Sequence, residues 1–279
     1  MIEVFSQIKT MKNDGYSSIQ LGFDDISERK IKRTQKGHLS KSGVSGVRNF
    51  KEFRTESDLD VKLGSKVGWI VMEFPGLLVF PLVFMAGRNA LEPVPLFFLC
   101  VWMIHYANRA LITPLLMRVQ PGSQSSFALN VVIAGWITLS LHGYFNAAYI
   151  SELSDQYNIS WFSDPRFISG LIIYLVGFSI NIYSDTILRN LRSLKPTPNE
   201  PRYKVPYGGL FKWVSCPQYF GEILSFVGFA VMTWNLGAVF VLAMTAGNLI
   251  PRARYTHKWF HKNFENYPAE RKAIIPFIL

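Results

Sequence analysis

Four polar side chains recur at helical spacing behind an apolar stretch of the sequence. They are Asn181, Asp185, Arg189 and Arg192, and they follow the apolar run 170–178. On a helix with 3.6 residues per turn, residues 4, 8 and 11 positions apart lie within about 80° of one another, so the four groups form one stripe. Polar groups of this kind are costly inside a membrane, and by default they mark a functional site.

A second polar set opens the next apolar run. Ser215, Gln218 and Glu222 again have helical spacing. They either pair with the first stripe as a structural network across a helix interface or bind a ligand together with it. Neither a G-x-G-x-x-G, a Walker loop nor an H-E-x-x-H motif occurs in the sequence. A nucleotide would therefore have to be held by side chains rather than by a glycine-rich turn.

Glu73 is a lone acid inside the apolar segment WIVMEFPG, two positions before Pro75. Proline frees a backbone carbonyl and bends a helix, which makes room for a cavity. A carboxyl group in such a segment must be neutral or partnered. Because no basic residue shares its span, we interpret Glu73 as functional. The alternative is a structural ion pair with a basic group on another helix.

The segment HYANRALITP places four hydrogen-bonding side chains within five positions of an apolar run. These are His105, Tyr106, Asn108 and Arg109. Their number implies that some are structural. Tyr106 is the first choice for contact with a substrate, since a phenol can donate to a carbonyl while its ring stays in an apolar pocket. His105 follows closely as the second choice.

Composition indicates an integral membrane protein. Of 279 residues, 49% are hydrophobic and 15% aromatic, which excludes an ordinary soluble domain. The net charge of +10 comes from basic residues between apolar runs, so it indicates membrane topology rather than nucleic-acid binding. The two cysteines, Cys100 and Cys216, lie in apolar segments and are expected to be packing residues, with no disulfide or metal pattern.

The order of apolar and charged segments predicts an all-α, polytopic transmembrane helical bundle. Residues 1–65 predict a mobile cytosolic extension without a secretory signal, and residues 66–279 the membrane domain. The six apolar runs are 67–86, 94–117, 127–150, 167–184, 210–234 and 236–250, the last of them short. Loop 186–208 and the tail from Arg252 are basic, whereas loop 151–165 is acidic. Six spans with both termini cytosolic satisfy the positive-inside rule.

The basic and aromatic tail has two interpretations. It is either a membrane-surface helix that binds anionic lipid headgroups or a segment that closes over a phosphorylated cofactor. In the second case the contacts come from Arg252, Arg254, His257 and Lys258. The second interpretation rests on the arginines, because a planar guanidinium matches phosphate geometry.

Seven segments together resemble the steroid 5α-reductase family (3-oxo-5α-steroid 4-dehydrogenases) over about residues 66–279. They are MEFPG, HYANRALITPLLMR, DPRFISG, INIYSDTILRNLR, YKVPYGGLF, VSCPQYFGE and FENYPAERKAIIPF, in the family's order. The resemblance implies a multi-helix fold in the endoplasmic reticulum membrane and NADPH as cofactor. It also implies reduction of the carbon–carbon double bond conjugated to the 3-ketone of a steroid or sterol-like lipid.

The resemblance also assigns residues. Glu73 and Tyr106 match the pair that hydrogen-bonds the steroid ketone. The positions that match or adjoin the family's cofactor contacts are Asn181, Asp185, Arg192, Tyr203, Lys204, Gln218, Glu222, Arg252 and His257. Gln218 stands where the family commonly has asparagine, and Met-Glu replaces a Gln-Glu pair. The family normally has seven helices, with one before the MEFPG span, where residues 1–65 here are polar.

Other readings remain open at the level of sequence. A trans-2-enoyl-CoA reductase-like lipid reductase would share NADPH but would lack the context of the MEFPG glutamate and the INIYSD motif. An isoprenylcysteine carboxyl methyltransferase would instead bind S-adenosylmethionine. A transporter is disfavoured because the sequence shows no internal repeat. An inactive relative without the family's first helix is a further alternative.

Overall fold

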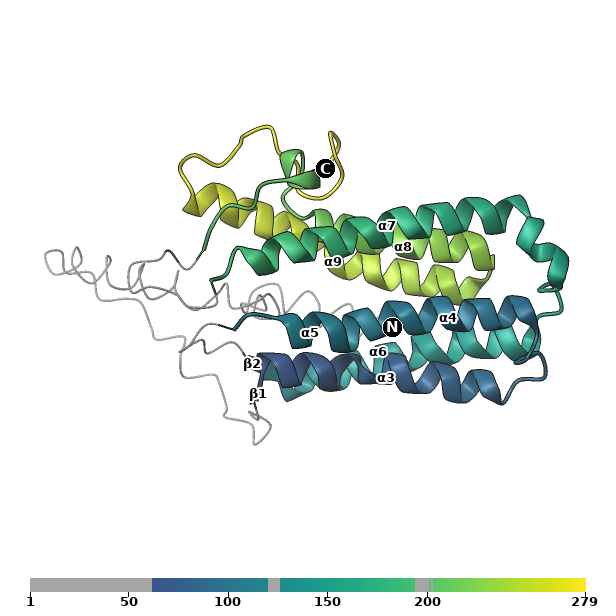
Figure 1. The fold of residues 1–279 in the computed structure, drawn as a ribbon. Helices are drawn as coiled ribbons and strands as arrows, with labels where there is room; N and C mark the ends of the chain where they lie inside the picture. Colours follow the sequence, from purple (N-terminus) through teal and green to yellow (C-terminus); the bar gives the residue numbers. More distant parts are fainter. Residues whose placement is uncertain (1–61, 120–125, 194–200, 202) are drawn as a thin grey trace, which may run out of the picture.

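The computed structural model describes residues 62–119, 126–193, 201 and 203–279, and it is almost entirely helical (Figure 1). The α-helices are α3 (Ser65–Met85), α4 (Pro93–Ala107), α5 (Thr113–Leu116), α6 (Leu129–Ala148), α7 (Pro165–Asn190), α8 (Pro217–Thr233) and α9 (Leu236–Asn263). Two π-helical segments, η3 (Asn108–Ile112) and η4 (Tyr149–Leu153), continue α4 and α6, and two 3₁₀ turns are η5 (Ile159–Ser163) and η6 (Gly209–Lys212). Strands β1 (Lys62–Gly64) and β2 (Ser126–Ala128) pair antiparallel.

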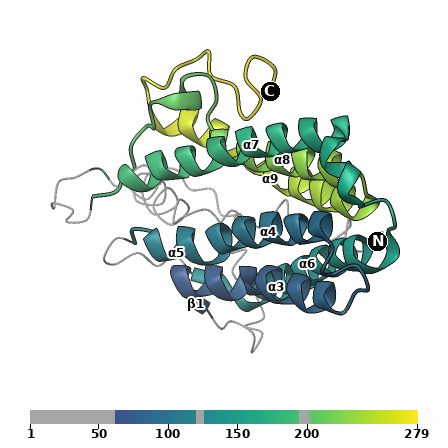
Figure 2. The same ribbon diagram turned by 45° about the vertical axis from the view of Figure 1, so that its right-hand side comes forward.

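The helices form two groups of three. Helices α3, α4 and α6 lie on one side and α7, α8 and α9 on the other, as both views show (Figures 1 and 2). Five helical segments are long and apolar enough to cross a membrane, among the residues that the structure describes. The prediction of an all-α polytopic membrane protein is therefore confirmed. Five of the six predicted apolar runs coincide with these segments, and the remaining run, 210–234, contains the shorter helix α8.

Two boundaries differ from expectation. The last span is not short, because α9 continues through the basic segment to Asn263 and reaches 28 residues. The short segment is instead α8, with 17 residues, whereas α4 continues through η3 and α5 into a segment of 24 residues. Residues 62–65, expected in the polar extension, belong to the fold because their main chain forms β1 and begins α3. The predicted mobile extension otherwise lies outside the described residues.

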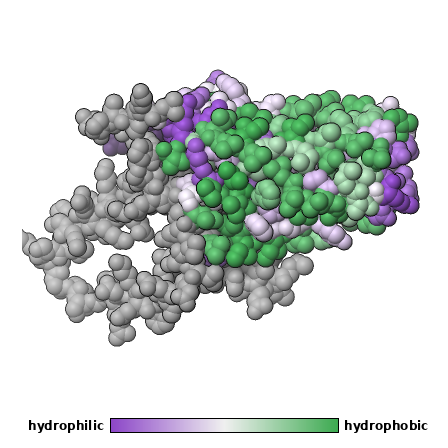
Figure 3. Space-filling view, turned by 60° about the horizontal axis from the view of Figure 1, so that its bottom comes forward, coloured by the Kyte–Doolittle hydropathy of each residue, from purple (hydrophilic) through white to green (hydrophobic). Residues whose placement is uncertain are grey.

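Charged loops gather at the two ends of the bundle. The basic end carries β1, α5 and the last turns of α7 and α9, whereas the opposite end carries the α3–α4 turn and residues 154–164 (Figure 1). Apolar residues cover much of the side of the bundle between its ends (Figure 3). The predicted separation of basic loops from the acidic loop 151–165 agrees with this arrangement. Arg88 at the opposite end is paired with Asp155 at 2.7 Å.

Glycines bring α7 and α8 into close contact. A Cβ atom added to Gly221 would lie 2.5 Å from the main-chain nitrogen of Asn181 and 2.6 Å from the carbonyl oxygen of Gly177. Small residues of this kind let helix backbones approach in membranes, where packing rather than hydrophobicity drives association. The close approach places Asn181 directly beside the first turns of α8.

Aromatic packing fills the half of the bundle toward the opposite end. Phe80 stacks on Trp102 with ring centroids 4.4 Å apart, and the Trp102 indole donates to the carbonyl of Gly76 at 2.9 Å. Pro75 has no N–H for the carbonyl of Val71, which instead accepts a hydrogen bond from the indole of Trp136. The proline thus costs α3 one internal bond without leaving that carbonyl unsatisfied.

Candidate active site

Arg109 links two buried carboxylates from different helices. Its Nε donates to Glu73 Oε1 at 3.0 Å, and its Nη1 lies 3.0 Å from Glu222 Oε1. Glu73 is 3% exposed and Glu222 4% exposed. Glu73 comes from α3, Arg109 from η3 and Glu222 from α8, so the contact joins the two groups of helices. Charge-assisted bonds in so dry a place are strong and directional.

The π-helical turn η3 sets the direction of the Arg109 side chain. A π-turn inserts an extra residue into an α-helix and changes the direction of the side chains around it, and such turns are frequent at functional sites. Here it begins at Asn108. The indole of Trp69 donates to the main-chain carbonyl of Arg109 at 3.1 Å, and its ring centroid lies 5.7 Å from the guanidinium carbon.

Glu222 is ion-paired with Arg109 and accepts a hydrogen bond from Asn181, whose amide donates to its Oε2 at 3.0 Å. His105 Nε2 lies 3.4 Å from its Oε1, which is an ion-pair distance without a hydrogen bond. The Asn181 amide also donates to the carbonyl of Gln218 at 3.0 Å. Hydrogen bonds to the charged form favour that form, so this environment suits an ionised carboxylate.

Glu73 is held less completely. Its Oε1 accepts from Arg109, but its Oε2 is buried and has no hydrogen-bond partner within the part of the chain that the structure describes. The ion pair with a basic group of another helix, which was the alternative reading from sequence, is therefore present. It uses only one of the two oxygens of Glu73.

Tyr106 lies within electrostatic range of this carboxyl group. It is 2% exposed, its ring packs against Gly76 one turn along α3 from Glu73, and it interacts electrostatically with Glu73. The rings of Trp102 and His105 flank it at 4.7 and 5.3 Å. The structure therefore brings the predicted pair, Glu73 and Tyr106, into one neighbourhood.

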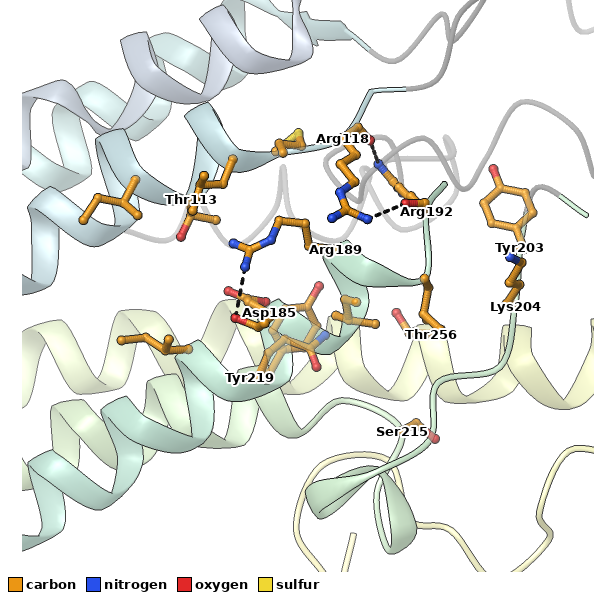
Figure 4. Close-up of a pocket in the computed structure, with 18 of the residues that line it drawn as sticks. Thr113, Arg118, Asp185, Arg189, Arg192, Tyr203, Lys204, Ser215, Tyr219 and Thr256 are labelled. Atoms are coloured by element: carbon orange, nitrogen blue, oxygen red, sulfur yellow. Dashed lines mark hydrogen bonds between the residues drawn. The ribbon is translucent and has the colours of Figure 1, made fainter. Parts of the chain in front are cut away.

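Two connected pockets open from this network toward the basic end. We call the larger one, of about 250 Å³, the outer pocket (Figure 4). It is lined by η3, α5, α7, the start of α8, part of α9 and the segment around Tyr203. The inner pocket, of about 30 Å³, includes Trp69, His105, Arg109 and Glu222. Asn108, Thr113 and Asp185 line both pockets, so the two adjoin.

Basic side chains face the outer pocket from several elements. Arg118 donates to the main-chain carbonyl of Arg192 at 2.9 Å, and Arg192 donates to that of Arg118 at 3.0 Å (Figure 4). Lys204 and Arg189 also line the pocket. The reciprocal bonds fix two guanidinium groups, 74 residues apart in the chain, side by side. This arrangement suits phosphate groups.

The structure distributes the predicted cofactor residues over these surfaces. Asp185, Arg192, Tyr203, Lys204 and Gln218 line the outer pocket, and Asn181 and Glu222 line the inner one, as Asp185 also does. His257 and Arg252 line neither. His257 hydrogen-bonds Ser215, a pocket residue, at 2.7 Å, and Arg252 interacts electrostatically with Tyr219, which is another.

The residues missed from sequence are Arg109 and Arg118. Arg109 is one of four polar groups in its apolar run and received no role from the sequence, and Arg118 received none either. A single arginine in an apolar run with no acid in its own span was the available signal for Arg109. Nothing in the sequence indicates that Arg118 meets Arg192.

Other chemistries find less support. Among the described residues no group of histidine, cysteine and acidic side chains could hold a metal ion. Burial raises the pKa of Cys216 to about 12, so its thiol is a poor nucleophile.

A buried network of Arg109, Glu73 and Glu222 lies beside a pocket lined by basic side chains, within a bundle of membrane helices. Residues 125–279 match the model of the family described as 3-oxo-5-alpha-steroid 4-dehydrogenase. The chain is 39% identical over 218 residues to steroid 5-alpha-reductase DET2 of Arabidopsis thaliana, covering 76% of this chain and 80% of the relative.

Relatives from animals have about the same sequence identity to this chain as the plant relative. 3-Oxo-5-alpha-steroid 4-dehydrogenase 1 of Bos taurus is 37% identical over 222 residues, covering 78% of this chain and 82% of the relative. The protein of the same name from Homo sapiens is 38% identical over 222 residues, with coverage of 78% and 82%. The chain therefore belongs to the 3-oxo-5-alpha-steroid 4-dehydrogenase family.

Proposed function

We propose that this protein is an NADPH-dependent reductase that saturates the double bond of Δ4-3-keto steroids. One observation carries the proposal beyond family membership. Glu73 is anchored to Arg109 through Oε1, while its buried Oε2 has no partner among the described residues. A protonated carboxyl group in this position would donate to a ligand acceptor, and the ketone oxygen of a steroid is such an acceptor.

The residues around Glu73 suit polarisation of a ketone. Addition of a hydride at carbon 5 of the enone moves negative charge onto the ketone oxygen, and a proton must then reach carbon 4. Preorganised donors at the oxygen stabilise that charge. Glu73 would supply one hydrogen bond and the Tyr106 hydroxyl the second. The surrounding rings of Trp102 and Phe80 exclude water, which strengthens both bonds.

The outer pocket fits a phosphorylated nicotinamide cofactor. Arg118, Arg192 and Lys204 would hold phosphate groups, and Asp185 and Gln218 offer partners for hydroxyl and amide groups. NADPH, when bound, supplies the hydride. Three basic side chains around one pocket favour NADPH over NADH, since NADPH carries an additional phosphate. The inner pocket shares lining residues with the outer one and includes Arg109, so the two ligands would meet near this residue.

The decisive experiment measures product. Membranes containing the protein are incubated with NADPH and a panel of Δ4-3-keto steroids, and 5α-reduced steroids are quantified. We expect product in the wild type and strongly reduced product with Glu73→Gln. Glu92→Gln, in the exposed turn at the opposite end, is the matched control and should behave as wild type. Absence of 5α-reduced product from the wild type with every steroid would refute the proposal.

We further propose that the protein resides in the endoplasmic reticulum with its basic end and both termini in the cytosol. The separation of basic and acidic loops between the two ends supports this orientation. NADPH is then delivered from the cytosolic side, where the outer pocket opens. Protease protection of terminal tags in sealed microsomes tests it, because both tags should be digested without detergent.

A further inference from the structure

Two segments of the chain form a cap on the flank of the bundle at its basic end. We call residues 207–216 and 271–279 the cap, which includes the turn η6. The main-chain N–H of Ser215 donates to the carbonyl of Lys272 at 2.8 Å, and Val214 and Lys272 form a parallel β-bridge. The cap lies outside α7, on the side away from α3 and α4, in both ribbon views (Figures 1 and 2). The segment after α9 is thus fastened to the residues just before α8.

The cap lies at the depth where the hydrocarbon of a membrane gives way to the headgroups. Helix α7 has 26 residues, and at 1.5 Å per residue it is longer than the roughly 30 Å hydrocarbon core. Asp185 and Arg189 are in its last turns, so the excess length belongs at this end. The cap contacts these turns, because a Cβ atom added to Gly209 would lie 2.7 Å from the ring of Tyr183. Tyr183 is itself an exposed tyrosine, a residue type enriched at membrane interfaces.

The outer surface of the cap combines large apolar side chains with two lysines. Phe277 and Ile278 are 75% and 78% exposed. The rings of Phe277 and Trp213 lie 6.1 Å apart, and Lys212 Nζ lies 5.4 Å from the centroid of the Trp213 ring. Lys272 is also exposed. At a membrane surface, aromatic rings enter the boundary of the acyl chains while lysine ammonium groups reach the headgroups.

A strained hook holds the apolar tip of the cap outward. The main-chain N–H groups of Ile274 and Ile275 both donate to the carbonyl of Leu279 at 2.7 Å, which closes the hook. Phe277 has a φ of +66°, in the left-handed region that bulky residues rarely adopt. Such strain needs compensation from the surroundings. Packing within the chain does not supply it, since Phe277 and Ile278 are exposed, whereas insertion of both side chains into a membrane would.

The lysines decide the charge of the partner. No ion pair joins Lys212 or Lys272 to a carboxylate within the part of the chain that the structure describes. A lysine close to an anionic membrane surface strengthens binding about fivefold. Apolar side chains that insert, beside ammonium groups without carboxylate partners, fit a bilayer that contains anionic lipids. Lipid is also the neighbour that α7 has at this depth, because α7 is one of the membrane-spanning helices.

The cap also forms part of the outer pocket. Ser215 lines that pocket, and its main chain is bonded to Lys272. The Ser215 hydroxyl lies 2.7 Å from the Tyr267 hydroxyl and 2.7 Å from His257 Nδ1. A displacement of residues 271–279 would therefore move the wall of the pocket at Ser215.

We propose that the cap docks on anionic lipids of the membrane around the bundle, and that this contact steadies the wall of the outer pocket at Ser215. Phe277, Ile278 and Trp213 enter the acyl boundary, and the ammonium groups of the two lysines lie among the anionic headgroups. The consequence for the cofactor rests on the proposed function, because it requires NADPH in the outer pocket. The contact with lipid does not rest on it and is measured separately.

Fluorescence quenching tests the contact with lipid in the full-length protein, reconstituted into nanodiscs. The bromine atoms are carried near the headgroup end of the acyl chains, on either phosphatidylcholine or phosphatidylserine. The emission of Trp213 is obtained as the difference between the wild type and Trp213→Phe. We expect it to be quenched by both lipids and more strongly by brominated phosphatidylserine. The double variant Lys212→Gln/Lys272→Gln should lose this preference. Absence of quenching, or equal quenching by the two lipids in the wild type, overturns the proposal.

Titration with NADPH tests the coupling in nanodiscs of phosphatidylcholine with and without phosphatidylserine. The double lysine variant should bind NADPH about threefold to tenfold more weakly than the wild type when phosphatidylserine is present, and equally well without it. Lys262→Gln removes an exposed charge from the last turn of α9, outside the cap, and is the matched control. Equal weakening in both kinds of nanodisc, or the same effect from Lys262→Gln, overturns the coupling. Absence of NADPH binding in every nanodisc would refute the proposed function, and the quenching would still decide whether the cap docks on lipid.

Discussion

The two ends of the bundle differ in how their charged side chains are paired. At the opposite end Arg88 pairs with Asp155 at 2.7 Å and Arg166 pairs with Asp164 at 2.7 Å, so each arginine has a local carboxylate. At the basic end Arg118 bonds to a main-chain carbonyl and has no carboxylate partner within the described residues. A protein that pairs Arg88 and Arg166 with carboxylates at one end, and holds Arg118 by a main-chain carbonyl at the other, has room for an anionic ligand beside Arg118.

The two buried glutamates in the middle of the bundle also differ in how completely their carboxylate oxygens are paired. Glu222 has donors on both of its oxygens, as a structural carboxylate would. Glu73, bound to the same arginine, retains one buried oxygen without a partner in the described chain. An unsatisfied buried polar atom costs roughly 1–3 kcal/mol, so its persistence needs a reason, and a ligand that completes it is one.

The largest effect that we expect separates Glu73 from an acid at the opposite end. Glu73→Gln keeps the shape of the side chain and an amide donor but loses the acidic O–H, and loss of a group that stabilises a developing oxyanion costs about 10²-fold or more in turnover. NADPH binding should hardly change. Glu152→Gln, whose carboxylate accepts from the main chain of Arg88, should leave turnover unaltered. Turnover of Glu73→Gln within a few-fold of wild type would make Glu73 structural.

The next effect concerns the basic groups. Arg192→Gln should weaken NADPH binding roughly ten- to a hundredfold, the usual value of a charge-assisted phosphate contact, and should affect NADH much less. Arg88→Gln removes an equally basic residue at the opposite end, where an exposed ion pair contributes little, and should leave both cofactors unaffected. Titration followed by protein fluorescence measures the affinity of each variant for NADPH and for NADH. Equal wild-type affinity for NADH and NADPH would contradict the assignment.

A third effect compares two glycines of the same helix interface. Gly221→Ala and Gly228→Ala each place a methyl group against the backbone of α7, at Asn181 and at Tyr174 respectively. Overpacking of this kind typically costs about 1–3 kcal/mol, so both variants should melt at lower temperature. Only Gly221→Ala displaces Asn181 from Glu222 and Gln218, and it alone should weaken NADPH binding several-fold. Equal affinities in the two variants would show that the Asn181 contacts do not matter for the cofactor.

The sequence predicts the helices well and the site in part. Apolar runs and loop charges determine where helices form, because each run is long enough to bury its own backbone bonds in a membrane. The stripe from Asn181 to Arg192 was recognisable because four members lie on a single helix. Contacts between helices, such as those of Arg109 with Glu73 and Glu222, depend on packing and on a π-turn that no periodicity shows. The strand pair around Leu63 was missed because three residues are too few to show alternation.

The smallest effect lies at the opposite end and tests whether its charges serve stability alone. Hydrogen bonds from the Arg166 side chain and main chain lower the pKa of Asp164 to about 2. A carboxyl group whose folded pKa lies below its ordinary value of about 3.9 adds stability that is fully present above that value. This stability disappears as the pH falls from about 4 to about 2.

Asp164→Asn still caps α7 but has no charge. It should therefore melt slightly below the wild type at neutral pH, and the gap should close through that acidic range. Steroid reduction at neutral pH should be unchanged, since the residue is remote from both pockets. A constant gap at every pH would show that capping geometry, rather than the ion pair with Arg166, accounts for the difference. Lower turnover in this variant would mean that the two ends are not independent.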